Sequence, residues 1–142
     1  MFSEKELLYK MPEQSVLNLA TGGFTRRVLV LTYFEPDAPH NRDFLIKILA
    51  AAGLNLETDT LFAEIPAGKP VSLLPAIKEK HAEIILIFGL HMAQLGFSID
   101  FPLYHIQSFY GTTILIADPL SVLEPDKLRK GKLWESLQQL FI

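Results

Sequence analysis

The sequence predicts a three-layer α/β domain, in which a mainly parallel sheet of about four strands carries helices on both faces. Short runs of β-branched and other apolar residues recur along the chain without polar alternation, as is typical of strands covered on both sides. Segments with helical spacing of their apolar residues lie between these runs. The repeated order of strand and helix favours parallel pairing, because each connection then crosses back over the sheet.

Four segments have the composition of buried strands: Arg27 to Tyr33, Thr58 to Ile65, Glu83 to Leu90 and Thr112 to Ala117. The third is the most strongly apolar of them. A further segment, Pro102 to Tyr110, is expected to be a short strand or extended chain. The edge of the sheet is therefore less well defined by the sequence than its centre.

Three helices are expected between and after these strands. The first begins at Asn41 or Asp43 and ends near Ala52, where Gly53 supplies the left-handed conformation that stops a helix. The second covers Val71 to Lys80. The last covers Asp126 to Phe141 and is expected to pack against the sheet through its apolar residues Leu133, Trp134, Leu137 and Leu140.

The length of 142 residues fits one domain. An apolar fraction of 49%, against 20% charged residues, is enough for a core of that size. Residues 26–142 are assigned to this domain and residues 1–25 to an amino-terminal helical extension. Ser3 and Glu6 have the spacing of a capping box at the start of that extension.

Composition excludes several kinds of site. The net charge of −3 provides no general attraction to nucleic acid, and the absence of cysteine excludes disulfides and cysteine-ligated metals. The four histidines lack paired helical spacing, so neither a metal nor another cofactor is expected; His91 stands out because it starts the turn after the third strand. No apolar run approaches the roughly 18–20 residues of a membrane span. The charged first ten residues do not resemble a secretion signal, so we expect a cytoplasmic protein without a membrane contact.

Three carboxylates follow predicted strands, at the edge of the sheet where ligands usually bind. Glu35 and Asp37 follow the first strand, and Asp118 follows the last. They either pair as catalytic acids, or serve as solvated loop residues and as a cap for the Asp-Pro turn. The chain has no glycine-rich phosphate loop after a strand, and Ser121 lacks the flanking glycines of a nucleophile elbow.

Two further groups are candidate binding residues. The basic cluster at the start of the last helix either contacts phosphates or an acidic partner, or forms a solvated helix face; it consists of Lys127, Arg129, Lys130 and Lys132. Apolar residues outside the sheet pattern either contact a partner or cover the core. These are Phe2, Leu7, Leu8 and Tyr9 near the amino terminus, and Phe101, Tyr104, Phe109 and Tyr110 before the last strand.

From Arg26 to Phe141 the chain resembles small members of the uracil-DNA glycosylase superfamily. The first strand leads into an acidic loop with a proline, Leu31 to Pro36, and the following helix ends in Gly53-Leu54. Phe88-Gly89 stands where that family has a Leu-Gly-like pair. The last strand enters a turn of the His-Pro-Ser type before a helix with Trp134. The resemblance implies the glycosylase-like fold.

The same resemblance argues against base excision. Thr32 to Pro36 reads TYFEP in place of the family's Gly-Glu-x-Pro-Gly or Gly-Gln-Asp-Pro motif, so only Glu35 can replace the water-orienting acid. Asp118 occupies the position of the catalytic histidine, and Leu120 that of the serine. An acid there would repel the negative charge that develops on a departing uracil.

The chain is also similar to the psi-subunit family of the bacterial DNA polymerase III clamp loader. Its size, its charge, its amino-terminal extension and its closing helix with Leu133-Trp134 carry this similarity. In that family the amino-terminal segment reaches the clamp-loader ATPase subunits and the folded body binds the chi subunit. The resemblance implies a non-catalytic interaction subunit of replication or repair machinery that docks through Met1 to Ala20. Two alternatives stay open: a glycosylase or hydrolase using Glu35 and Asp118, and a nucleic-acid-binding module using the basic cluster.

Overall fold

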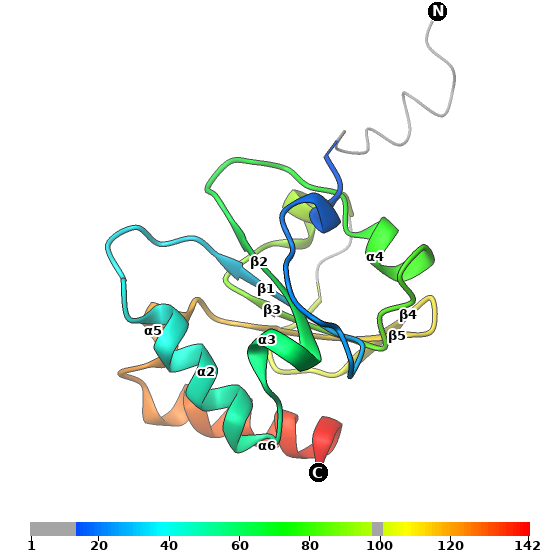
Figure 1. Ribbon diagram of the computed structural model, residues 1–142. Helices are drawn as coiled ribbons and strands as arrows, with labels where there is room; N and C mark the ends of the chain where they lie inside the picture. The colour runs from blue at the N-terminus through cyan, green and yellow to red at the C-terminus, as the bar shows by residue number, and fades with distance from the viewer. Residues whose placement is uncertain (1–13, 98–100) are drawn as a thin grey trace, which may run out of the picture.

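The computed structural model describes residues 14–97 and 101–142, and it confirms an α/β architecture with a mostly parallel sheet. The sheet has the strand order β2-β1-β3-β5-β4 (Figure 1). Four strands are parallel, namely β1 (Val28–Tyr33), β2 (Thr60–Ile65), β3 (Ile84–Phe88) and β5 (Thr112–Ala117). The fifth strand, β4 (Gln107–Phe109), pairs antiparallel with β5 at one edge. It lies within the segment that the sequence left as strand or extended chain, and it raises the number of strands from about four to five.

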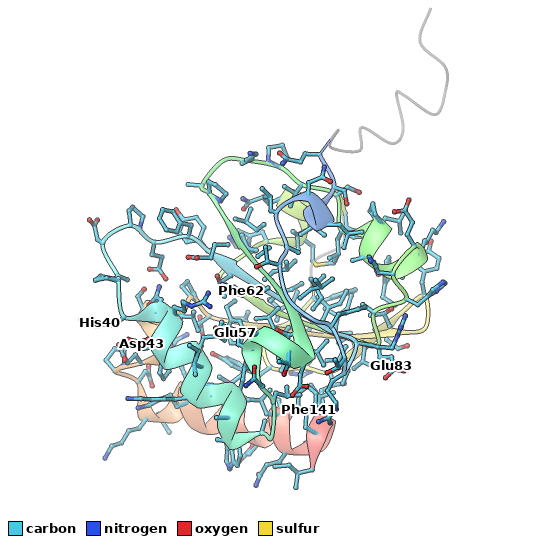
Figure 2. All side chains as sticks on the ribbon, viewed as in Figure 1. His40, Asp43, Glu57, Phe62, Glu83 and Phe141 are labelled. Atoms are coloured by element: carbon cyan, nitrogen blue, oxygen red, sulfur yellow. The ribbon has the colours of Figure 1, made fainter. Side chains whose placement is uncertain are left out.

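Alternate side chains of each central strand enter two separate cores. On β1, Val28 and Val30 belong to one core, whereas Leu29 and Leu31 belong to the other. The strands β3 and β5 divide their residues in the same way. The reason is that successive side chains of a strand point to opposite faces. This two-sided burial explains why these strands are almost continuously apolar (Figure 2).

Helices cover each face of the sheet (Figure 1). One face carries α2 (Asn41–Ala51), α3 (Leu56–Asp59), α5 (Leu120–Leu123) and α6 (Lys127–Phe141). The other face carries α4 (Leu74–Lys78) and the 3-10 helices η1 (Val16–Asn18) and η2 (Met92–Leu95). The result is a three-layer arrangement with most of the helical mass on the α2–α6 side.

Local hydrogen bonds set the ends of the helices. Asp126, which the sequence placed inside the last helix, accepts a hydrogen bond from the backbone amide of Arg129 at 3.1 Å and so caps α6. Gly53 follows α2 with a φ of 83°, in the left-handed region. The expected helix Val71 to Lys80 is shorter than predicted, because Ser72 pairs with Ser15 in a β-bridge and α4 begins only at Leu74.

Residues 14–25, which the sequence assigns to the extension, are bonded to the sheet and its loops. Val16 is fully buried, and its amide donates to the carbonyl of Ser72 at 2.9 Å. Thr21 and Phe62 exchange two backbone hydrogen bonds along the outer edge of β2. The candidate binding residues Phe2, Leu7, Leu8 and Tyr9 lie outside the described residues.

Candidate functional site at the carboxyl edge of the sheet

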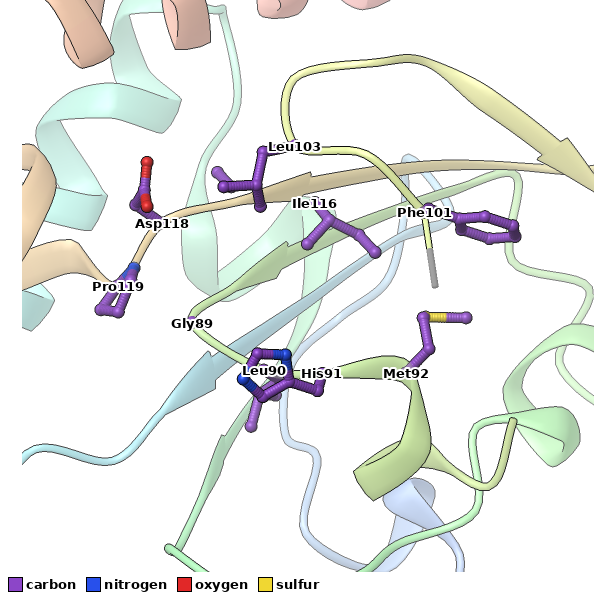
Figure 3. Close-up of a pocket in the computed structure, with 10 residues that line it drawn as sticks. Gly89, Leu90, His91, Met92, Phe101, Leu103, Ile116, Asp118 and Pro119 are labelled. Carbon is purple, nitrogen blue, oxygen red and sulfur yellow. The ribbon is translucent and has the colours of Figure 1, made fainter. Parts of the chain in front are cut away.

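The carboxyl ends of β3 and β5 border a cavity of about 300 Å³ (Figure 3). Most of its lining is apolar, and among the described residues the two polar side chains in it are those of His91 and Asp118. The other lining residues are Gly89, Leu90, Met92, Phe101, Leu103, Ile116, Ala117 and Pro119. Small-molecule sites usually occupy about 300–1,000 Å³, so this cavity is at the lower limit of that range.

The close approach of two strand ends requires glycine at position 89. The amide of Gly89 donates to the carbonyl of Ala117 at 3.0 Å. Its φ of 79° is left-handed, and a Cβ atom there would lie 3.0 Å from the Cα of Pro119. Any other side chain would therefore be strained and would push the β5 turn away. This contact shapes one side of the cavity.

Asp118 is held by two neighbours on other elements. The Tyr104 hydroxyl donates to Oδ2 of Asp118 at 2.5 Å, and Nη1 of Arg129 donates to the same oxygen at 2.8 Å. The carboxylate is only 12% exposed, and in Figure 3 it points away from His91. Partial burial and the bond to Asp118 raise the pKa of Tyr104, because both disfavour the phenolate. Asp118 thus anchors the turn after β5 to α6.

Arg129 connects Asp118 with the cap of α6. Its Nε donates to Asp126 at 3.0 Å while Nη1 contacts Asp118. The pKa of Arg129 is raised, chiefly by its hydrogen bond to Asp118. The pKa of Asp126 is lowered, chiefly by the backbone amide of Arg129. The guanidinium is therefore engaged by two carboxylates of its own chain.

Glu35 joins the loop after β1 to two helices. It accepts hydrogen bonds from the hydroxyl of Ser121 and, at 3.4 Å, from its backbone amide. It also accepts from Nδ2 of Asn41 at 3.1 Å. Asn41 begins α2 and Ser121 lies in α5, so one carboxylate fastens both helix starts to the sheet edge.

The remaining charged residues that the sequence singled out lie apart from the cavity. Asp37 is exposed in the loop after β1, and Lys127 and Lys132 are exposed on α6. Lys130 is partly exposed and faces α2. The structure thus assigns the four basic residues of the cluster to different surroundings.

The aromatic residues near β4 divide into two roles. Phe101 and Phe109 pack against the core, with their ring centroids 6.0 Å apart in an edge-to-face arrangement. Tyr110 packs on Phe109 at 4.5 Å but remains 72% exposed. Phe101 also lines the cavity, so the cluster reaches the cavity through this one residue.

Sequence reasoning identified His91 and Asp118 but missed Tyr104 as the partner of Asp118. The two residues are 14 positions apart, and no short-range pattern links them. Leu103 and Phe101 also border the cavity, because the segment before β4 passes over the end of β5. The sequence analysis did single out Tyr104 as one of several aromatic residues before the last strand. That pattern does not indicate which residue its hydroxyl contacts.

Metal ligands and membrane-spanning helices are not found in the part of the chain that the structure describes. Within residues 14–97 and 101–142, no three histidine or acidic side chains are grouped so that they could hold a metal ion. Over the same residues, no helix has the length and apolar character needed to cross a membrane.

Comparison with known proteins gives no family assignment. No family model matches this chain, and no curated protein matches it.

Proposed function

We propose that this chain is a non-catalytic protein-interaction subunit of DNA replication or repair machinery, similar in role to the psi subunit of the DNA polymerase III clamp loader. The observation that carries the proposal is the use of the strand-end acids: Glu35 and Asp118 both hold other parts of the fold. The sequence resemblance to that family supplies the replication setting.

A general base needs a carboxylate within reach of the proton that it removes. Glu35 directs both oxygens to Ser121, with a further bond from Asn41. Asp118 is paired with the cation Arg129, and its carboxylate points away from His91. Redirecting Glu35 to a substrate would break bonds that hold α2 and α5 in place, and rotating Asp118 would break its bond to α6. The sheet edge therefore serves as a scaffold in this proposal.

An interaction role is supported by apolar side chains that remain on the surface. Phe34, Val122 and Leu128 are each at least 40% exposed, and Leu128 reaches 81%. By the same resemblance, Met1 to Ala20 reaches a clamp-loader ATPase subunit and the folded body binds a second subunit. Two contacts of this kind would make the chain an adaptor between proteins.

The test is affinity isolation of the tagged full chain from its own cells, followed by mass spectrometry. The companion variant lacks residues 1–13 only, because Val16 is buried and a longer deletion would open the core. We expect the full chain to recover clamp-loader subunits, and the truncated chain to recover no ATPase subunits. Recovery of no replication or repair protein by either chain would refute the proposal.

A base-excision glycosylase is the second candidate, because His91 and Asp118 border the same cavity. Only Oδ2 of Asp118 accepts the bonds from Tyr104 and Arg129, so Oδ1 is the oxygen that such an enzyme would use. The assay is release of uracil or another modified base from duplex and single-stranded oligonucleotides. We expect no release; release that Asp118→Asn abolishes would replace our proposal with this one.

A further inference from the structure

An apolar groove lies between α2 and α6, on the helical face opposite α4. It has a volume of about 220 Å³. We call it the α2–α6 groove, and its lining consists of Lys47, Ile48, Ala51, Lys130, Leu133, Trp134 and Leu137. It is separate from the cavity at the carboxyl edge of the sheet, with which it shares no residue.

The spacing of the lining residues explains the shape of the groove. The α6 residues recur at i, i+3, i+4 and i+7 from Lys130, which places them on one stripe of the helix. Leu133 and Leu137 are buried in the core below, so they form a floor that does not depend on a ligand. Ile48 and Trp134 are partly buried and stand above that floor. A groove of this size is smaller than typical metabolite sites and fits one or two inserted side chains.

Two lysines give this apolar groove a positive charge. Lys47 comes from α2 and Lys130 from α6, so cations border the groove on both helices. Over the residues that the structure describes, neither lysine forms an ion pair, whereas Arg42 and Arg129 do. The whole chain carries a net charge of −3, so this local charge is opposite in sign to that of the molecule. Such a surface is complementary to a ligand that is both acidic and apolar.

We propose that the α2–α6 groove docks an acidic peptide segment of a partner protein. The segment inserts a large apolar side chain against Ile48 and Trp134, and its carboxylates pair with Lys47 and Lys130. The assignment rests on the proposed function, since it gives one interaction surface of an adaptor subunit. Apolar burial supplies most of the affinity, and the two lysines select for acidic sequences.

A displayed library of short random peptides, selected against the full chain, tests this inference without assuming a partner. We expect enrichment of peptides that combine aspartate or glutamate with a leucine, phenylalanine or similar residue. Trp134 is the single tryptophan of the chain, so its fluorescence reports binding of the selected synthetic peptides at the groove itself. The double variant Lys47→Glu/Lys130→Glu should weaken their binding about tenfold.

The matched control is Lys127→Glu/Lys132→Glu, which makes the same change of charge at two α6 positions that do not line the groove. It should bind the selected peptides nearly as well as the unmodified chain. Circular dichroism and urea unfolding verify that both variants are folded. Equal weakening by both variants, enrichment of basic or neutral peptides, or no enrichment would overturn the proposal. A dimer that only Lys47→Glu/Lys130→Glu dissociates would overturn it in favour of a second copy of this chain.

The groove and the adaptor function can fail separately. Affinity isolation repeated with Lys47→Glu/Lys130→Glu distinguishes the two cases. Replication partners recovered undiminished by this variant would refute the groove as their docking site while leaving the adaptor function intact. Selected peptides that bind as expected, with no replication or repair protein recovered by any chain, would refute the replication role alone.

Discussion

Arg129 donates a hydrogen bond from Nη1 to Oδ2 of Asp118 across 2.8 Å. The bond joins the first turn of α6 to the residue that follows β5. Arg129 also contacts Asp126, so a single guanidinium holds a strand end and a helix cap together. Asp118 is a candidate catalytic acid and Arg129 a candidate phosphate-binding residue. Their bond therefore links a residue of the alternative catalytic site to a residue of the alternative nucleic-acid-binding site.

Asp118→Asn should destabilise the fold by about 1–2 kcal/mol, because charge-assisted hydrogen bonds are worth more than neutral ones. The amide keeps one acceptor oxygen but loses the charge that faces Arg129. Urea unfolding followed by circular dichroism measures the effect. Asp37→Asn, at an exposed position after β1, is the control and should change stability by less than about 0.5 kcal/mol. Similar values for the two variants would show that the Asp118 bonds contribute little.

A double-mutant cycle should detect coupling between Glu35 and Ser121. Glu35→Ala and Ser121→Ala each remove the same side-chain hydrogen bond, so their effects on the free energy of unfolding should not add. We expect a coupling energy of at least about 0.5 kcal/mol. A second cycle pairs Glu35→Ala with Asn41→Ala, since Asn41 donates a hydrogen bond to the same carboxylate. Additive effects within error would mean that Glu35 does not hold α5.

Stability should fall at alkaline pH through Tyr104. The pKa of Tyr104 is raised in the folded state, so its contribution is fully present below the unfolded pKa of about 10 and is lost as pH rises above it. Urea unfolding across that range measures the loss. Tyr104→Phe removes this ionisation, so its stability curve should be flatter there than that of the unmodified chain. Parallel curves for the two proteins would contradict the assignment.

Gly89→Ala should cost more stability than Gly53→Ala, although both glycines have a φ in the left-handed region. At Gly53 an added Cβ meets nothing within 4 Å, so only the backbone cost of about 1–2 kcal/mol applies. At Gly89 the same atom meets the backbone of Pro119, which adds repulsion and brings the cost to about 3 kcal/mol or more. Thermal and urea unfolding of the two variants give the comparison. Equal losses of stability in the two variants would show that the turn after β5 can shift away from the added Cβ at little cost.

The order of strands and helices could be predicted because it depends on local composition. An apolar run such as Ile84–Phe88 must be buried on both faces wherever it lies, and Asp126 can cap α6 from its position in the chain alone. The edge strand β4 was less predictable, because its three residues are held mainly by their pairing with β5. Likewise, the predicted start of the helix at Val71 was wrong, because Ser72 pairs in a β-bridge with Ser15, which is distant in the sequence.

The sequence by itself determined the α/β class, the central strands and which residues follow them, since burial and helix capping act over a few neighbouring positions. Only the tertiary structure decided how the charged residues are used. Glu35 meets Ser121 across 86 positions, and Asp118 meets Tyr104 across 14. Hydrogen bonds act over about 3 Å, so they depend on where parallel strands place their ends. The same holds for the α2–α6 groove, which forms where two helices lie side by side on one face of the sheet.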